Sequence, residues 1–173
     1  MFKNQASILL IASALLMLPG AAAAQPGKDK SAGVTTTAAG KGAVTMEGLM
    51  QRYEALAGSA DNAKSLVYGL RVKDEVVLVG EGTPCSGRFC KSGAVTVKFV
   101  PKTDPMGLGN IDIALALTEA DLEAKSVKAN PKELEAALQG GTVGGVTLEG
   151  ILKMRADGMG WGEIANLLGF KLK

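Results

Sequence analysis

The spacing of apolar residues predicts a pair of helices where the folded part of the chain begins. The segment MEGLMQRYEALAG follows Thr45, a residue type that caps helices, and ends at Gly58. Its predicted buried face consists of Leu49, Met50, Tyr53 and Leu56. The next segment, residues 61–71, has a similar stripe of Ala63, Leu66, Val67 and Leu70. Each helix can bury one face, so we expect the two to pack together.

The apolar period then shortens to two residues, which is typical of strands. Residues 75–80 (EVVLVG) and 94–100 (AVTVKFV) are rich in β-branched residues, and the second segment alternates apolar and polar positions. Turn-forming residues fill the sequence between them. A β-hairpin is therefore expected. Because an isolated hairpin is only marginally stable, it should pack on the helices.

Two interpretations compete for residues 110–127, NIDIALALTEADLEAKSV. The alternation of apolar residues over 110–117 fits a strand, whereas a helix from Asn110 would also gather apolar residues on one side. The length of the segment and its content of Ala, Leu and Glu favour the helix. On that helix, Glu119, Asp121 and Glu123 are expected to form a solvated face.

Capping signals predict a further helix over residues 130–138, NPKELEAAL. Asn130 is placed as the N-cap, Pro131 as the first helical residue and Glu133 as the partner in a capping box. The glycine pair 140–141 ends the helix.

Two more helices are expected at the C-terminal end, one beginning at Thr147 and one spanning residues 161–168. The segments VTMEGLM (44–50) and VTLEGIL (146–152) share four identities in register. They fit either an internal duplication of a helix pair or merely a common way to begin a helix. Together the patterns predict an α+β fold, mainly α, with five or six short helices packed with one β-hairpin.

The N-terminus has the pattern of a secretory signal peptide. Lys3 precedes the apolar run 7–18, which is followed by a Pro-Gly breaker and small residues, so residues 1–24 should be cleaved between Ala24 and Gln25. The apolar run is too short to span a bilayer. A retained membrane anchor is the alternative. We therefore expect a periplasmic or secreted protein without membrane insertion after signal removal.

The rest of the chain divides into a linker and a domain. Residues 25–43 mix Gly, Ala, Thr, Lys and Pro without apolar periodicity, which predicts a flexible linker. Residues 44–173 are long enough for a single small globular domain.

Composition excludes several classes of chemistry. The chain has no histidine, which removes His-dependent nucleophilic triads, histidine general bases and His-bearing zinc sites. Loss of Lys3 with the signal leaves 18 of the 19 basic residues against 17 acidic ones. This near-neutral charge does not favour nucleic acid as a partner. The glycine-rich turns 106–110 and 158–162 lie beside acidic residues, which disfavours phosphate binding, so no cofactor is expected. Asp104 and Asp112 lack the spacing of a calcium loop, so no metal is expected either.

The remaining candidates are a cysteine pair and a few residues typical of interfaces. Cys85 and Cys90 lie in the turn of the predicted hairpin, where an exported protein would form a disulfide. Free thiols or a redox pair are the alternatives, although the spacing is not C-x-x-C. Arg88, Phe89 and Trp161 are candidates for an interaction surface, because Arg and Trp are enriched in binding hot spots. For Trp161 the alternative is packing in the core.

The C-terminal sequence carries two resemblances. ILKMRADGMGWGEIANLLGF is similar to the first two helices of resolvase-like or sigma-like domains, but the helix that would read DNA does not follow. The segments GLGNIDIALAL, NPKELEAALQGGTV and GILKMRADGMGWGEIANLLGFKL resemble a group of small, mostly uncharacterised exported bacterial proteins that end in an MGWGxIAxxLG-type motif. That resemblance implies a helical fold around a small hairpin and no particular activity.

These observations favour a non-enzymatic exported protein that binds another protein or a component of the cell envelope. The expected contact surface lies near the hairpin tip and the C-terminal helix pair. One alternative is an envelope hydrolase that relies on Asp and Glu alone, which needs Glu119 or Asp121 in a cleft with another acid. The other is a thiol-redox protein that uses Cys85 and Cys90.

Overall fold

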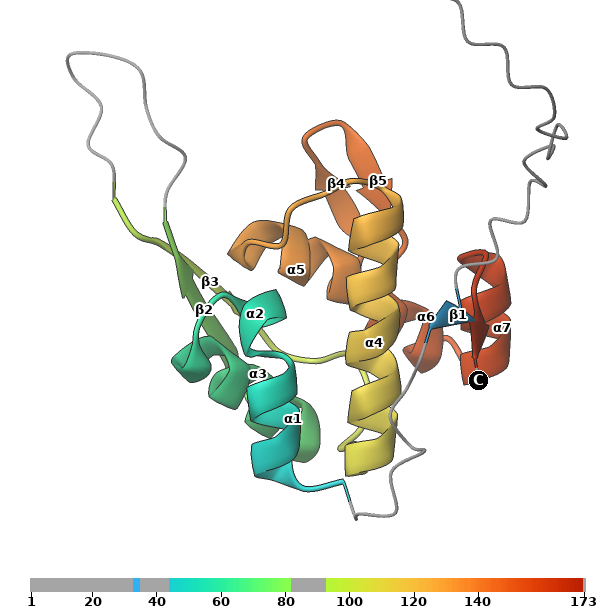
Figure 1. Cartoon of the computed structure of the whole chain (residues 1–173), viewed down its shortest axis with the longest axis horizontal. Coiled ribbons are helices and arrows are strands. Elements are labelled where there is room, and N and C mark those ends of the chain that lie inside the picture. The colour runs from blue at the N-terminus through green and yellow to red at the C-terminus, as the bar shows by residue number, and fades with distance from the viewer. Residues whose placement is uncertain (1–32, 35–43, 82–92, 173) are drawn as a thin grey trace, which may run out of the picture. The chain divides into compact units, whose positions relative to one another are not determined.

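The computed structural model describes residues 33–34, 44–81 and 93–172, and these form the expected α+β, mainly helical fold (Figure 1). The described helices are α1 (Met46–Arg52), α2 (Glu54–Ala57), α3 (Ala60–Val72), α4 (Leu108–Ala124), α5 (Pro131–Gln139), α6 (Ile151–Ala156) and α7 (Trp161–Leu167). The described strands are β1 (Gly33–Val34), β2 (Val76–Gly80), β3 (Val95–Phe99), β4 (Gly141–Val143), β5 (Val146–Leu148) and β6 (Lys171–Leu172).

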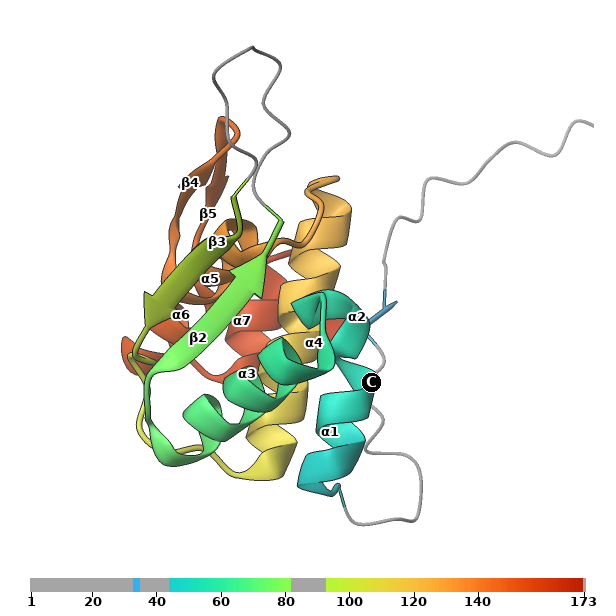
Figure 2. The same ribbon diagram turned by 90° about the vertical axis from the view of Figure 1, so that its left-hand side faces the viewer.

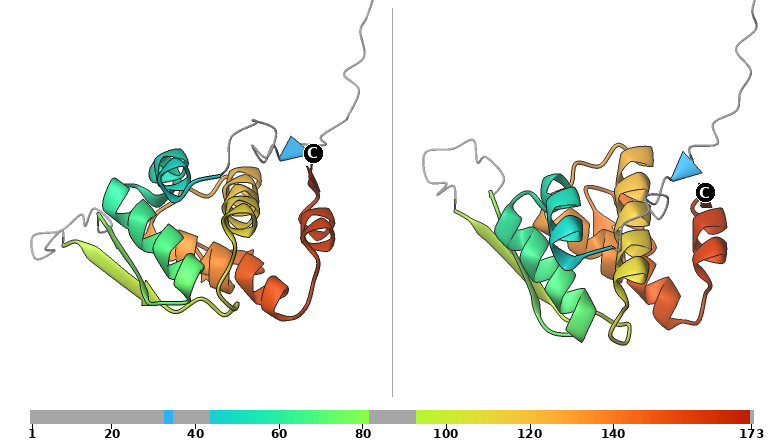
Figure 3. Two further views of the ribbon diagram at one scale, coloured as in Figure 1. Left: turned by 90° about the horizontal axis from the view of Figure 1, so that it is seen from below. Right: turned by 60° about the horizontal axis from the view of Figure 1, so that its bottom comes forward.

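Helix α4 is the centre of the fold. It contacts α1, α3, α5 and α6, and it lies between the α1–α3 layer and the α6–α7 layer (Figure 3). Its buried residues therefore occupy more than one face, among them Ile111, Ala116 and Leu117. Burial on several sides explains why the apolar pattern fitted both a helix and a strand, and the helix interpretation is confirmed.

The predicted N-terminal helix pair is confirmed, with a break that the pattern did not indicate. The Thr45 hydroxyl accepts a hydrogen bond from the Gly48 amide at 3.0 Å, as expected of the cap. The helix is interrupted at Tyr53, whose ψ of 14° separates α1 from α2. Ser59 then caps α3, and the expected stripe on α3 is buried.

The predicted hairpin is β2 and β3, which pair antiparallel with Val76 opposite Phe99 (Figure 2). Val97 and Phe99 face the core while Thr96 and Lys98 are exposed, which confirms the alternation. The outer edge of β2 is covered by α3. Asn62 bonds both the amide and the carbonyl of Val79, at 2.9 and 2.8 Å, so a side chain takes the place of a third strand.

The prediction of a helix starting at Thr147 was wrong. Residues 146–148 are strand β5, paired antiparallel with β4 in a second short hairpin. Gly144 and Gly145 both have positive φ, 57° and 80°, which is the backbone of a tight two-residue hairpin turn. The helix begins only at Ile151, after Gly150. The segments 44–50 and 146–152 therefore differ in structure, which gives the duplication no support.

The helices predicted over residues 130–138 and 161–168 are both present. Helix α5 starts at Pro131 after Asn130 and ends at Gly140, but the Asn130 side chain makes no capping hydrogen bond, so the expected capping box is absent. Helix α7 begins at Trp161, as predicted.

Part of the predicted linker is described. Gly33–Val34 form β1, which pairs in parallel with β6, while the other residues of 25–43 lie outside the described part of the chain. None of the helices that the structure describes combines the length and the apolar character needed to cross a bilayer.

Candidate functional site

Most of the sequence-predicted site residues lie outside the part of the chain that the structure describes. This applies to the disulfide candidates Cys85 and Cys90, to Arg88 and Phe89, and to the cleavage site Ala24–Gln25. The predictions that rest on them stay predictions. Of the predicted site residues, only Trp161 lies in the described part of the chain.

Trp161 is partly buried at the first position of α7, where it contacts two polar side chains. Its indole Nε1 donates to Asn110 Oδ1 of α4 at 3.1 Å. The guanidinium carbon of Arg155, from α6, lies 5.1 Å from the centre of the indole ring, within the range of a cation–π contact. Arg155 also donates through Nη1 to the Met159 carbonyl at 2.8 Å. Trp161 is thus neither a fully buried core residue nor an isolated surface one.

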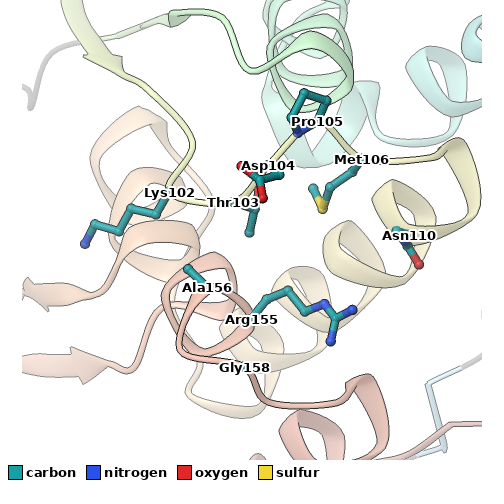
Figure 4. A pocket seen from close by; sticks show the side chains of 9 residues that line it. All are labelled: Lys102, Thr103, Asp104, Pro105, Met106, Asn110, Arg155, Ala156 and Gly158. Atoms are coloured by element: carbon teal, nitrogen blue, oxygen red, sulfur yellow. The ribbon is translucent and has the colours of Figure 1, made fainter.

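Arg155 and Asn110 line a pocket of about 480 Å³ (Figure 4). Its other walls are residues 102–106, which connect β3 to α4, and Ala156 and Gly158 at the end of α6. This volume is in the range of small-molecule sites. The pocket brings together two stretches that are well separated in sequence, Lys102 to Asn110 and Arg155 to Gly158, and Trp161 contacts one residue of each.

The connection that forms one wall is held by backbone and side-chain bonds from α3. The Met106 amide donates to the Leu70 carbonyl at 3.1 Å, and Arg71 Nη1 donates to the Met106 carbonyl at 2.9 Å. Lys73 pairs with Asp104 at 3.1 Å. These contacts tie the wall to the end of α3 at two residues, Asp104 and Met106, so this part of the pocket is built on anchored backbone.

The opposite wall is the turn between α6 and α7. Gly158 has a φ of 96°, a conformation that favours glycine. The Gly160 amide donates to Glu163 Oε2 at 2.7 Å, which caps α7. The glycines of this motif therefore make a tight turn, as predicted, and Glu163 serves the helix start.

The charges of the lining are unequal. Lys102 and Arg155 are cations with no ion pair among the described residues, and Asp104 is the one acid of the wall. Asp104 is already paired with Lys73, and its side chain is 93% exposed. The Lys102 ammonium points away from Arg155 in Figure 4 and donates to the Gln139 carbonyl at 3.0 Å. Arg155 is therefore the cation placed to act inside the pocket.

Comparison with known proteins identifies no relative. No family model, curated protein or solved structure matches this chain.

A second polar cluster lies between α1 and α4. The Tyr53 hydroxyl is 2.7 Å from Asp112 Oδ1 and 2.9 Å from the Asp112 carbonyl, and Arg52 Nη1 is 2.9 Å from the same Oδ1. Tyr53 and Asp112 are buried. Burial first, then the Asp112 carboxylate, raises the pKa of the Tyr53 phenol far above its usual value. The cluster joins two helices through Asp112 Oδ1, which accepts hydrogen bonds from both Tyr53 and Arg52.

The prediction that Glu119, Asp121 and Glu123 form a solvated face of α4 was only partly right. Asp121 is buried, and Lys125 neutralises it at 2.7 Å across one helical turn. Glu119 is half-buried, and that burial, followed by repulsion from Glu123, raises its pKa. Neither Glu119 nor Asp121 lines the pocket. Among the described residues, no group of three His, Cys, Asp or Glu side chains could hold a metal ion.

Replacing Tyr53 with phenylalanine is expected to lower the free energy of unfolding by about 1–3 kcal/mol, because the Asp112 carboxylate loses a buried donor. The substitution should also abolish a loss of stability that the Tyr53 phenol causes in the unsubstituted protein at alkaline pH. The folded state keeps the phenol proton, whereas the unfolded chain releases it near pH 10, so stability falls as the pH rises above about 10. Urea titrations at neutral and alkaline pH would measure both effects.

A Tyr68→Phe protein provides the control, because the chain has two tyrosines and only Tyr53 then remains. In that protein, tyrosinate absorbance should appear together with unfolding. Ionisation of Tyr53 near pH 10 in the intact fold would contradict the role assigned to its burial.

Proposed function

We propose that this chain is an exported, non-enzymatic binding protein whose partner is another protein or a component of the cell envelope. The partner contacts the surface formed by the pocket and Trp161, which we call the Trp161 surface: residues 102–106, Asn110, 155–159 and Trp161. Export rests on the N-terminal pattern of a signal peptide.

One observation carries the choice of surface. Trp161 is the single tryptophan of the chain, it remains partly exposed, and its two polar contacts tie it to residues that line the pocket. Tryptophan and arginine in a fixed, partly desolvated arrangement are the residue types that dominate binding energy at interfaces.

The two alternatives gain less support from the described residues. A hydrolase that uses acids alone needs two carboxyl groups facing one substrate, and the pocket wall has only Asp104. Asp112 and Asp121 are held by Arg52 and Lys125. The thiol-redox alternative depends on Cys85 and Cys90, outside the described residues.

Crosslinking in living cells tests the proposal. A photoreactive amino acid at Met159, which is 36% exposed beside Arg155, should capture the partner in a defined adduct. The same amino acid at Tyr68 on α3, which is 50% exposed, is the matched control and should give no such adduct. Trp161→Leu should reduce the Met159 adduct about tenfold or more, since it removes a hot-spot side chain.

Several results would overturn the proposal. Equal adducts from Met159 and Tyr68 would mean that contact is not confined to the Trp161 surface. The absence of any Met159 adduct, or an adduct unaffected by Trp161→Leu, would rule out that surface as the contact.

A further inference from the structure

The pocket contains hydrogen-bonding groups that the described part of the protein does not use. Thr103 is only 5% exposed and lines the pocket, yet its hydroxyl oxygen is buried without a hydrogen-bond partner among the described residues. Because this oxygen is closed to the pocket, the donors that a ligand can reach lie on other lining residues. Thr103 follows Lys102 in the wall that α3 anchors.

The Asn110 amide is oriented by the tryptophan. An indole N–H can only donate, so the atom that faces Trp161 at 3.1 Å must be the amide oxygen. The NH₂ group of Asn110 is therefore left as the donor, and no partner for it is found among the described residues. Asn110 lines the pocket, so this donor belongs to the site.

Arg155 completes the set. Its guanidinium is fixed by the Met159 carbonyl and by the indole ring, and it still has several N–H donors beyond the one in use. In Figure 4 its side chain extends toward the side of the pocket where Asn110 lies. A pre-oriented guanidinium loses little conformational freedom when it binds a planar anion.

We propose that the pocket binds the carboxylate group of a ligand, with Arg155 as the charged anchor and the Asn110 amide as an additional donor. The inference rests on the proposed binding function and specifies its chemistry. The groups available to a ligand, the Asn110 NH₂ and the remaining N–H groups of Arg155, are all donors, which match an anion. A single fixed guanidinium matches the planar, singly charged carboxylate better than a dianionic phosphate. The volume of about 480 Å³ leaves room for the body of the ligand beside this group.

Titration of the full exported chain tests this directly, because the single Trp161 provides one indole N–H signal and one source of tryptophan fluorescence next to Arg155. The probes are acetate, an N-acetylated trialanine with a free C-terminal carboxylate, the same peptide as its amide, the amide of a glutamate-containing analogue, and inorganic phosphate. The trialanine with a free C-terminus and the glutamate-containing amide both carry a carboxylate, so both should shift the indole signal. The trialanine amide carries none and should not shift it. Comparing the peptides with acetate separates a peptide-borne carboxylate from a small free acid.

Three variants sharpen the result. Arg155→Met should weaken carboxylate binding about tenfold to a hundredfold. Lys153→Met, which removes another cation from α6 outside the pocket, should leave binding unchanged. Thr103→Val should leave binding unchanged and the protein equally or more stable to urea, because it removes a hydroxyl that has no partner and is closed to the pocket. A hydroxyl with a purely structural role would give the opposite change in stability.

Equal shifts by phosphate or by the trialanine amide would overturn carboxylate recognition, as would the absence of any shift. So would equal binding by the Arg155→Met and Lys153→Met proteins. These outcomes are distinct from failure of the proposed function: a Met159 crosslink that persists without carboxylate binding would leave the Trp161 surface as a contact and remove only the ligand chemistry.

Discussion

Replacing Gly150 with alanine is expected to lower the free energy of unfolding by about 3–6 kcal/mol, since the substitution combines backbone strain with a severe overlap. Gly150 has φ 84° and ψ 100°, a conformation that side chains disfavour. A Cβ at this position would lie 2.3 Å from the Gly140 nitrogen and 2.6 Å from the Gln139 carbonyl carbon. Both atoms are backbone, so the end of α5 or the start of α6 would have to move.

Gly58→Ala is the matched control for this prediction. Gly58 has a similar φ of 82°, but nothing lies within 4 Å of the Cβ that alanine would add. Its replacement should cost about 1 kcal/mol, the strain alone. In urea denaturation, the loss that Gly150→Ala shows beyond Gly58→Ala reports the overlap together with the added strain of the Gly150 ψ of 100°, since Gly58 has a ψ of −10° in the left-handed helical region. Equal losses in the two proteins would mean that the approach of Gly150 to Gly140 is not a tight one.

Three other glycines, Gly140, Gly144 and Gly145, explain one correct and one wrong prediction from the sequence. Gly140 marked the end of α5 correctly, because a helix ends where its backbone takes a conformation outside the helical region. Thr147 was assigned to a helix because Thr followed by Glu is a strong capping signal. The competing signal was Gly144-Gly145, whose positive φ values close the β4–β5 hairpin. Three-residue strands are too short for the alternation to be visible in sequence.

The candidate site was only partly predictable. Trp161 was predicted as an interaction residue from its residue type alone. The local sequence around Arg155, Asn110 and Thr103 does not indicate a site. They converge because α4 crosses the centre of the fold and brings its first turn to the end of α6, a contact between residues about 45 positions apart. The burial of Asp112 and Asp121 was missed for a related reason. Their partners, Arg52 from another helix and Lys125 one turn on, make burial possible.

Replacing Asn62 with alanine is the second change expected to have a large effect. Asn62 is 3% exposed, and its Nδ2 donates to the carbonyls of Ala57 and Val79 while its Oδ1 accepts from the Val79 amide. The variant leaves these backbone groups without partners at the junction of α2, α3 and β2. We expect a loss of about 3–5 kcal/mol in the free energy of unfolding, measured by urea titration.

Hydrogen exchange gives this prediction a local readout. Asn62→Ala should speed exchange of the Val79 amide far more than that of Val77, whose amide donates to the Ser65 hydroxyl at 2.8 Å. Ser65→Ala should reverse that order at a cost of about 1 kcal/mol, and it remains informative if Asn62→Ala fails to fold. Lys64→Ala, at an exposed position between the two, should change neither amide. If the Val79 amide stayed protected in Asn62→Ala, the hairpin edge would not depend on this side chain, and β2 would have to be held to α3 by its apolar contacts alone.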